Sequence, residues 1–369
     1  MKESLARRLL PSALAVAGFL VLAEGVLSWG YAFWKARESV TSRVRPEHQH
    51  ARHDAELGWT NVPGVLVRDL YGPGKNFTAN AQGFRAREAY GASIPAERCR
   101  VVFAGDSFTM GFGVGDDATY PARVEHLEPR IQSVNLGMGA YGADQAFLRY
   151  RRDAAGVQHN VVVFAFIAHD FRRMELDYYM APKPRLALAN GKLVVENAPV
   201  PERDSRRDAR TALAAFLQHL DLGRVLSRAL RALTPAQTQG DAERIAAAKR
   251  SIPAAAVAEA MFEELAALAR ERTAKLLLVY LPTLGELELQ AQPVRDWAER
   301  AARSRGLAFV DATPAFRGRE AAPLFGLANH YSEAGNTLVA EALLPELRGQ
   351  CGLAPAATAS EPPTAPTTP

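Results

Sequence analysis

The chain has only two cysteines, Cys99 and Cys351, among its 369 residues. Two cysteines so far apart exclude both a disulfide-dense scaffold and a cysteine-based zinc site. Aromatic residues make up 8%, and the net charge of +4 comes from interspersed residues of both signs. No basic stripe studded with aromatics is present, so nucleic acid is not an expected partner. No internal repeat is visible. The apolar share of 48% suffices for one large hydrophobic core or two modest ones.

Long apolar runs are also scarce, with one exception at the N-terminus. Residues 9–34 read LLPSALAVAGFLVLAEGVLSWGYAFW, in which Glu24 carries the only charge. About 20 apolar residues span a bilayer core as a helix, and aromatic residues at the far end are typical of a membrane interface. We therefore predict a cytoplasmic stub and transmembrane anchor over 1–37. The rest of the chain would lie on the periplasmic side of the inner membrane.

Two alternatives to this anchor exist. A cleaved signal peptide is the stronger one, with VLA at residues 21–23 as its cleavage site. The apolar run outlasts the usual signal-peptide core of about 7–15 residues, which favours the anchor. A buried helix of a soluble protein ranks below both.

Residues 38–98 are predicted to form a stalk and a lead-in to the main domain. The polar first part contains His48, His50 and His53. A solvated stalk is favoured over a metal site, because three histidines on flexible chain lack the rigid geometry that ligation requires.

The lead-in contains two segments punctuated by glycine or proline, DAELGWTNVPG at 54–64 and NAQGFRAREAY at 80–90. Both segments are typical of irregular chain. Trp59 and Phe84 are expected to fasten them to the main domain.

From residue 99 to 351, short apolar runs alternate with longer amphipathic segments. Continuous Val, Ile and Leu runs indicate strands covered on both faces, and strand–helix alternation indicates a parallel sheet with right-handed crossovers. We predict an α/β domain with about five parallel strands. The expected strands are 100–105, 131–136, 160–167, 275–281 and 307–311, and the expected helices are 119–128, 143–155, 254–273, 289–305 and 333–348.

An insertion over residues 183–250 interrupts this alternation. Its first part has two short strand patterns around Asn190-Gly191, a pair favoured in two-residue hairpins. Charged, alanine-rich helices are expected over 203–250. They form either a lid over the strand ends or a solvated flap, and the sequence does not decide between the two. The Pro/Thr/Ala-rich tail at 352–369 is expected to be disordered.

Chemistry-bearing residues follow several of the predicted strands. Ser107 lies just past the first one, and ligands bind outside the carboxyl ends of parallel strands. A serine hydroxyl needs a base to become a nucleophile, and His330, after the last strand, lies at the same edge. The turn at 135–145 offers backbone N–H groups there, and His169 offers a side chain.

The segment AGDSFTMGFGVGDDATYP, residues 104–121, resembles the first block of the SGNH/GDSL hydrolase superfamily, specifically of bacterial, membrane-tethered members. The resemblance covers roughly residues 54–350. It implies a three-layer, flavodoxin-like fold and a serine esterase, and no cofactor or metal is expected. The residues it assigns are Ser107 as nucleophile and first oxyanion donor, Ala140 and His169 as further oxyanion donors, Asp170 as the acid that matches the third block, and His330 as base. Asp106 is expected to hold the nucleophile loop by accepting backbone N–H groups.

Three positions depart from the family pattern. Ala140 replaces a glycine but keeps its N–H, and His169 replaces an asparagine but still donates as a neutral imidazole. Leu327 replaces the aspartate that normally orients the histidine, and losing that carboxylate from a triad can cost about 10⁴ in rate. Asn329, a backbone carbonyl or Asp311 are the candidate substitutes. The chain is then either a Ser–His dyad with a substitute orienting group or a weakened enzyme.

The two cysteines flank the predicted α/β domain. Cys99 precedes its first strand and Cys351 follows its last helix, so both are expected at the edge of the sheet opposite Ser107. We predict a disulfide between them, which fits an oxidising compartment. Such a bridge would add roughly 4–5 kcal/mol of stability in the chain-entropy description.

Three functions fit these observations. An envelope-tethered esterase would release acyl groups, preferably acetyl groups of surface polysaccharide. An acyltransferase would form the same acyl-enzyme and pass the group to a sugar hydroxyl. A catalytically impaired module would bind glycan or a partner protein, a hypothesis that Leu327 favours.

Overall fold

The structure is a computed structural model that describes residues 47–202, 254–287 and 292–354. The described residues belong to one compact unit. The anchor predicted within 1–37, the helices predicted over 203–250 and the tail beyond 354 lie outside these ranges. In the ranges that are described, no helix has the length and apolar character needed to cross a membrane.

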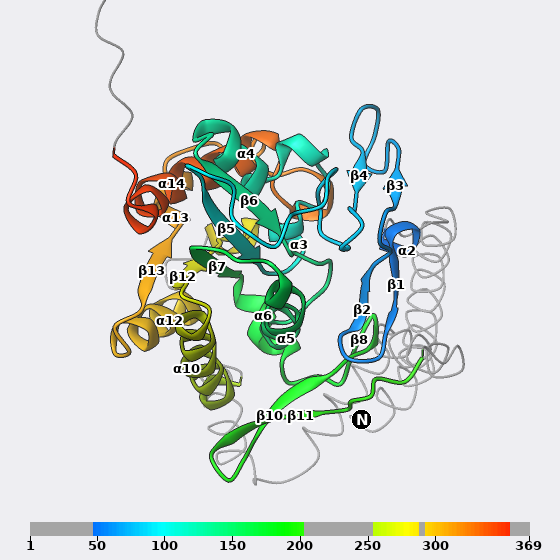
Figure 1. Ribbon diagram of the computed structural model, residues 1–369, viewed down its shortest axis with the longest axis vertical. Coiled ribbons are helices and arrows are strands. Elements are labelled where there is room, and N and C mark those ends of the chain that lie inside the picture. Colours follow the sequence, from blue (N-terminus) through cyan, green and yellow to red (C-terminus); the bar gives the residue numbers. More distant parts are fainter. Residues whose placement is uncertain (1–46, 203–253, 288–291, 355–369) are drawn as a thin grey trace, which may run out of the picture. The chain divides into compact units, whose positions relative to one another are not determined.

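A five-stranded parallel sheet forms the centre of the unit (Figure 1). Its spatial order is β13-β12-β7-β5-β6, which is 2-1-3-4-5 in chain order and therefore flavodoxin-like. Every residue of β5 and β7 is buried, as expected for strands covered on both faces. All five predicted strands are confirmed, as β5 (Cys99–Ala104), β6 (Ile131–Asn135), β7 (Val161–Phe166), β12 (Lys275–Tyr280) and β13 (Ala308–Asp311).

Helices cover both faces of the sheet and complete a three-layer fold (Figure 1). The predicted helices are confirmed with small shifts at their ends. The helix expected from 289 begins at Pro293, since proline suits the first helical position. One layer contains α5 (Ala143–Asp153), α10 (Ala255–Glu271) and α12 (Pro293–Arg303), and the other contains α4 (Tyr120–Leu127) and α14 (Glu333–Cys351).

Four short helices follow strands at the carboxyl edge of the sheet. They are α3 (Ser107–Met110) after β5, α6 (Ala168–Arg173) after β7, α11 (Leu284–Leu287) after β12 and α13 (Thr313–Phe316) after β13. At the opposite edge, Cys99 begins β5 and Cys351 ends α14. These two cysteines form a disulfide, with their Cα atoms 5.8 Å apart.

The lead-in is more ordered than its sequence indicates. The expectation of irregular chain over 54–64 is wrong, because β1 (Ala51–Asp54) pairs antiparallel with β2 (Gly58–Asn61). Asp54 Oδ1 accepts hydrogen bonds from the N–H groups of Glu56 and Leu57, which closes the turn between the two strands. Gly58, which in the sequence indicated irregular chain, instead ends this turn with φ +84°. Two further short strands, β3 (Leu66–Val67) and β4 (Phe77–Thr78), follow.

The predicted stalk ends before His50, because this residue is part of the folded unit. The short helix α2 (Glu47–His50) carries the imidazole into the core, where it is 0% exposed and stacks on Phe77. Burial lowers the pKa of His50 to about 4. His53 Nε2 donates to the carbonyl of Val200 at 3.0 Å. Across the described ranges, no three His, Cys, Asp or Glu residues are grouped so as to hold a metal ion.

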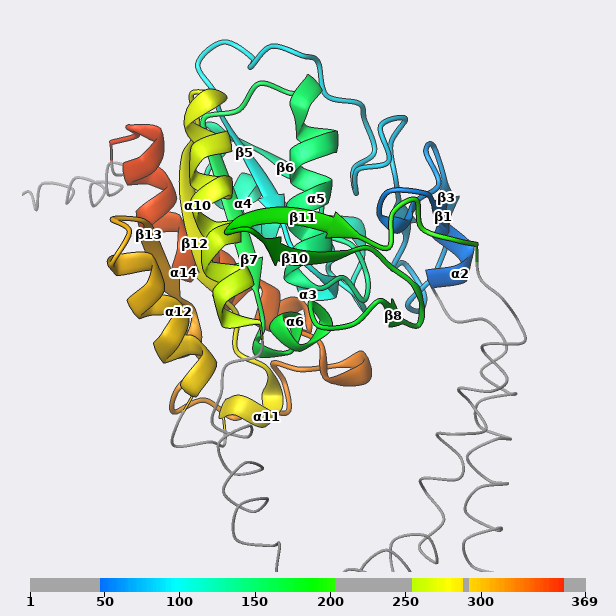
Figure 2. The same cartoon turned by 90° about the horizontal axis from the view of Figure 1, so that it is seen from below.

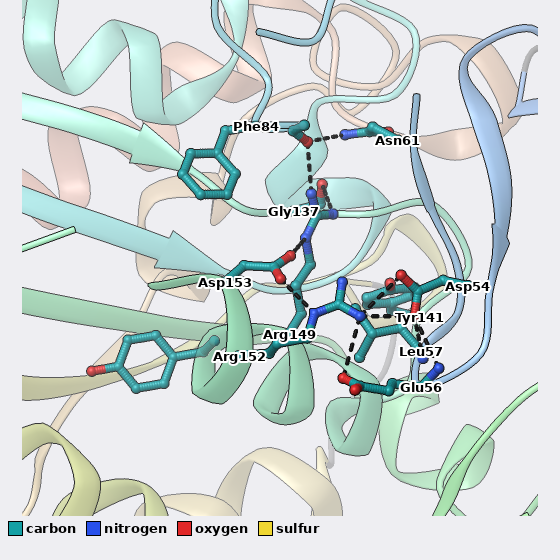
Figure 3. Close-up of polar contacts among 12 residues, drawn as sticks. Asp54, Glu56, Leu57, Asn61, Phe84, Gly137, Tyr141, Arg149, Arg152 and Asp153 are labelled. Atoms are coloured by element: carbon teal, nitrogen blue, oxygen red, sulfur yellow. Dashed lines mark hydrogen bonds and ion pairs between the residues drawn. The ribbon is translucent and has the colours of Figure 1, made fainter. Parts of the chain in front are cut away.

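Two arginines of α5 bind the lead-in to the sheet domain (Figure 3). Arg149 Nη2 donates to the carbonyl of Gly83 at 2.8 Å, and Arg152 Nη1 pairs with the Asp54 carboxylate at 2.8 Å. Phe84 is buried in the main core beside these contacts. The prediction that Phe84 fastens the lead-in is therefore confirmed.

The first part of the insertion is a hairpin, as predicted. Strands β10 (Arg185–Ala189) and β11 (Lys192–Glu196) pair antiparallel, and Asn190 and Gly191 both take positive φ values, +52° and +74°. Two shorter strands precede them, β8 (Tyr178–Tyr179) and β9 (Ala181–Pro182). Figure 2 shows β10 and β11 crossing the layer of α5 and α10. Leu186 is buried in the core there, so the hairpin is a packed part of the domain.

A buried ion pair fixes the start of this insertion. Lys183 Nζ lies 2.7 Å from Asp144 Oδ2, and both side chains are fully buried. The ammonium also donates to the carbonyls of Arg173, Leu176 and Pro184. Burial lowers the pKa of Lys183 and raises that of Asp144.

Substituting Lys183→Met is expected to lower the free energy of unfolding by about 3–5 kcal/mol, because the Asp144 charge would stay buried without its partner. The double variant Lys183→Met/Asp144→Leu should recover most of this loss, since neither charge is then buried. Urea unfolding of the three proteins tests the prediction. Equal losses in the single and double variants would contradict it.

Candidate active site

Ser107 is the first residue of α3 and lies three positions after Ala104, the last residue of β5. Asp106 caps this short helix, because its Oδ1 accepts the N–H of Phe108 at 2.9 Å. The N–H of Ser107 itself has no intrahelical partner, as is usual at a helix start. The cap therefore fixes the backbone turn that presents the serine hydroxyl at the carboxyl edge of the sheet.

The structure brings Ser107 and His330 together although 223 positions separate them. Ser107 Oγ lies 2.8 Å from His330 Nε2. On the other side of the ring, Nδ1 lies 3.1 Å from the carbonyl oxygen of Ala328. A carbonyl only accepts, so Nδ1 carries the hydrogen and Nε2 is free to take the serine proton.

The backbone carbonyl of Ala328 is therefore the group that orients the imidazole. Ala328 and Asn329 both have left-handed backbone, with φ +50° and +59°, and Gly326 N–H donates to the carbonyl of His330 to close the loop. The expected support from the Asn329 side chain is not found, since no hydrogen bond within the described residues joins it to the ring. Asp311 binds the N–H of Thr313 instead.

Two aromatic rings hold the imidazole in addition to this hydrogen bond. Phe108 stacks on His330 at 4.6 Å between centroids, and Phe112 packs against it at 4.7 Å. Tyr331, the next residue, donates its hydroxyl to the carbonyl of Pro282 at 2.6 Å. Ring packing thus replaces part of what a carboxylate at Leu327 would supply, and Leu327 itself is 52% exposed.

Burial lowers the pKa of His330 below its ordinary value of 6.5, because the packed rings disfavour the imidazolium. A general base must be neutral, and activity is lost as pH falls through its pKa. We therefore expect kcat/KM to stay level down to a pH below 6.5 and to fall only there. Substituting Phe112→Ala exposes the His330 ring to water. It should therefore raise the pH at which kcat/KM falls on the acid side of the profile, called the acid limb. A wild-type limb at or above 6.5 would contradict this account.

The turn after β6 approaches the nucleophile helix closely. A Cβ at Gly137 would lie 2.1 Å from the backbone nitrogen of Met110, so only glycine fits there. Three residues on, Ala140 has φ +63°. Its N–H has no hydrogen-bond partner in residues 47–202, 254–287 or 292–354.

His169 lies in the first turn of α6, after β7, where the residue is exposed to solvent on one side and its ring is partly buried on the other. Partial burial and the charges of Arg173 and Arg172 lower its pKa, so the ring is neutral near pH 7 and has one N–H. No hydrogen bond links it to Ser107 or to another described residue. The structure thus places His169 at the predicted edge without a hydrogen bond to the nucleophile.

Arg173, which was not predicted from the sequence, connects three segments of the site. Its Nη1 lies 3.2 Å from Asp106 Oδ2, 2.8 Å from Asp170 Oδ1 and 2.8 Å from the carbonyl oxygen of Tyr141. Burial and the neighbouring Asp106 raise the pKa of Asp170 well above its usual range. The three-residue spacing of Asp170 and Arg173 on one helix was the available signal.

Arg85 of the lead-in is a second supporting residue that was not predicted from the sequence. It is 5% exposed, and its Nη1 donates to the carbonyls of Met110 and Gly111, both at 2.6 Å. Its Nη2 donates to the carbonyl of Val114 at 2.7 Å. Arg85 therefore binds the C-terminal end of α3, while Asp106 caps the other end. Nothing in its local pattern distinguishes it from a surface arginine.

A cavity of about 280 Å³ lies beyond the ends of β12 and β13. Phe316, which lines it, stacks on Tyr331 with ring centroids 5.2 Å apart. The other lining residues are Leu284, Leu287, Gln292, Arg295, Thr313, Arg317, Gly318, Arg319 and Ala321. One lining residue of the cavity therefore contacts the residue that follows His330 in the chain.

Comparison with known proteins yields one sequence match and several structural ones. The model of the GDSL-like lipase/acylhydrolase family matches residues 103–338. A search of curated proteins gives no match.

Similar solved structures include a putative lipolytic protein of the G-D-S-L family from Desulfitobacterium hafniense DCB-2, with 16% identity, 67% of this chain and 99% of that chain covered, and a TM-score of 0.37. A second lipolytic protein of that family, from Veillonella parvula DSM 2008, has 12% identity over 67% of this chain and 97% of that one, with a TM-score of 0.37. An acetylxylan esterase from Geobacillus stearothermophilus, in a catalytic mutant form, has 15% identity over 67% and 93%, with a TM-score of 0.38. At these scores the structural similarities carry no argument, and the assignment depends on the family match.

Proposed function

Because the chain belongs to the GDSL-like lipase/acylhydrolase family, we propose that it hydrolyses carboxylic esters with Ser107 as nucleophile and His330 as base. The observation that carries the proposal is the 2.8 Å contact between Ser107 Oγ and His330 Nε2. The carbonyl of Ala328 on the opposite ring nitrogen supports it, since that contact leaves Nε2 able to accept a proton.

The proposed reaction has two balanced steps. In the first step Ser107 Oγ attacks the ester carbonyl while its proton passes to His330 Nε2. The tetrahedral intermediate then expels the alcohol, which takes that proton and leaves the acyl-enzyme. Water then attacks the acyl-enzyme with the same histidine as base, and this releases the acid and free Ser107. The N–H groups of Ser107 and Ala140, with the imidazole of His169, are the donors proposed for the oxyanion.

We propose acetyl esters of cell-envelope polysaccharide as the substrate class. The proposed location is the periplasmic side of the inner membrane, with residues 9–34 as a single-pass anchor. The Cys99–Cys351 disulfide supports an oxidising compartment, because structural disulfides persist there.

The test is hydrolysis of p-nitrophenyl acetate by the purified full-length chain, with Ser107→Ala as control. Serine-dependent release of p-nitrophenol supports the esterase, and release of acetate from acetylated polysaccharide supports the substrate class. Transfer of the acetyl group to an added glycan, in preference to water, would instead identify a transferase. If the wild type and the variant hydrolyse short and longer acyl esters equally slowly, the result favours the binding module over an enzyme.

A further inference from the structure

We propose that Trp59, in the lead-in, positions the oxyanion donor of Ala140. Trp59 Nε1 donates to the carbonyl oxygen of Gly139 at 2.9 Å. That carbonyl belongs to the same peptide unit as the N–H of Ala140. In a trans peptide the two groups point in opposite directions, so a bond that fixes the carbonyl also fixes the N–H. This inference rests on the proposed function.

The Gly139–Ala140 peptide needs an external restraint. Ala140 is held at φ +63°, a conformation unfavourable for a residue with a Cβ. Rotation of the peptide plane would relieve it and turn the N–H away from the position where the oxyanion develops. The indole bond opposes this rotation, and by polarising the carbonyl it also makes the N–H a stronger donor.

Trp59 is itself held from several sides, so it can act as a fixed support. The Tyr141 hydroxyl donates to the backbone carbonyl of Trp59, and the two rings pack edge to face at 5.6 Å. Two positions earlier, the carbonyl of Leu57 accepts a hydrogen bond from Gln145 Nε2 at 2.8 Å. Strand β2 therefore carries the indole on a rigid element rather than on a loop.

The test compares Trp59→Phe with a matched control, Trp297→Phe. Both variants lose one indole hydrogen bond, because Trp297 Nε1 donates to Glu259 at 3.0 Å between α12 and α10, outside the site. For p-nitrophenyl acetate we expect Trp59→Phe to lower kcat by about 10- to 100-fold, somewhat less than removal of an oxyanion donor itself. KM and the pH of the acid limb should stay unchanged. Affinity for phenylboronic acid, which forms a tetrahedral adduct with a serine hydroxyl, should fall by a similar factor.

Two results would overturn the inference. The first is an unchanged kcat in Trp59→Phe together with loss of activity in Ser107→Ala. That result would support the proposed esterase function and show that Trp59 does not position the donor. The other is an equal loss of kcat in both tryptophan variants, in step with their urea midpoints, which would show a purely structural role. A kcat loss confined to Trp59→Phe, with matching loss of boronate affinity, supports the inference.

Discussion

Alanine at Ser107 or at His330 is expected to lower kcat on p-nitrophenyl acetate by roughly 10⁴- to 10⁶-fold, and the double variant should lose no more than either single one. The two side chains share one proton along a 2.8 Å contact, so removing one leaves the other without a function. The remaining activity would come from substrate binding and from backbone donors, which both substitutions leave in place.

Steady-state kinetics of the four proteins measure this effect. Additive losses, with the double variant at the product of the single factors, would show that the two residues do not act as a unit. A His330→Ala variant with near wild-type kcat would identify a different base. His159, whose ring nitrogens contact Tyr150 and the carbonyl of Val157 in the interior, provides a control position at which kcat should not respond.

Substituting both cysteines, Cys99→Ala/Cys351→Ala, is expected to lower the free energy of unfolding by about 5 kcal/mol. The bridge closes a loop with a sequence separation of 252, and so it strongly restricts the unfolded chain. Catalysis at 25 °C should change little, because the bridge lies at the opposite edge of the sheet from Ser107. Urea unfolding with and without a phosphine reductant provides the measurement.

The reductant should bring the wild type to the stability of the double variant and leave the variant unaffected. The bridge would add no stability if the urea midpoint of the wild type stayed the same with reductant, even though unfolding exposes the bridge to it. A double variant as stable as the wild type would show the same. A large loss of kcat in the variant would show that the two edges of the sheet are coupled.

The sheet and the Ser–His pair could be predicted because each depends on a local pattern or a topological rule. Continuous apolar runs mark strands buried on both faces, and parallel strands bring their carboxyl ends to one edge. Ser107 and His330 each follow such a strand, so their meeting follows from topology. The hairpin at Asn190-Gly191 was predictable for a local reason as well, since both residues tolerate positive φ.

The supporting contacts were not predictable, because they join segments distant in the chain. Arg85 binds the carbonyls of Met110 and Gly111, 25 and 26 positions away, and Trp59 binds the carbonyl of Gly139, 80 positions away. For the group that orients His330, the sequence left three candidates open, Asn329, a backbone carbonyl and Asp311, and the structure shows that it is a backbone carbonyl, that of Ala328. The direction of a carbonyl depends on backbone torsions that no residue pattern here encodes.

The lead-in also bears on how the protein is trimmed for laboratory work. The family match begins at residue 103, and a designer of expression clones would naturally cut just upstream of β5. Such a clone would retain every reacting atom, yet it would lack Arg85 beneath the nucleophile helix and Trp59 beside the donor turn. Inactivity of that shortened product would therefore report a missing scaffold rather than a defective catalyst. A productive cut belongs before α2, which begins at Glu47 and carries the buried His50.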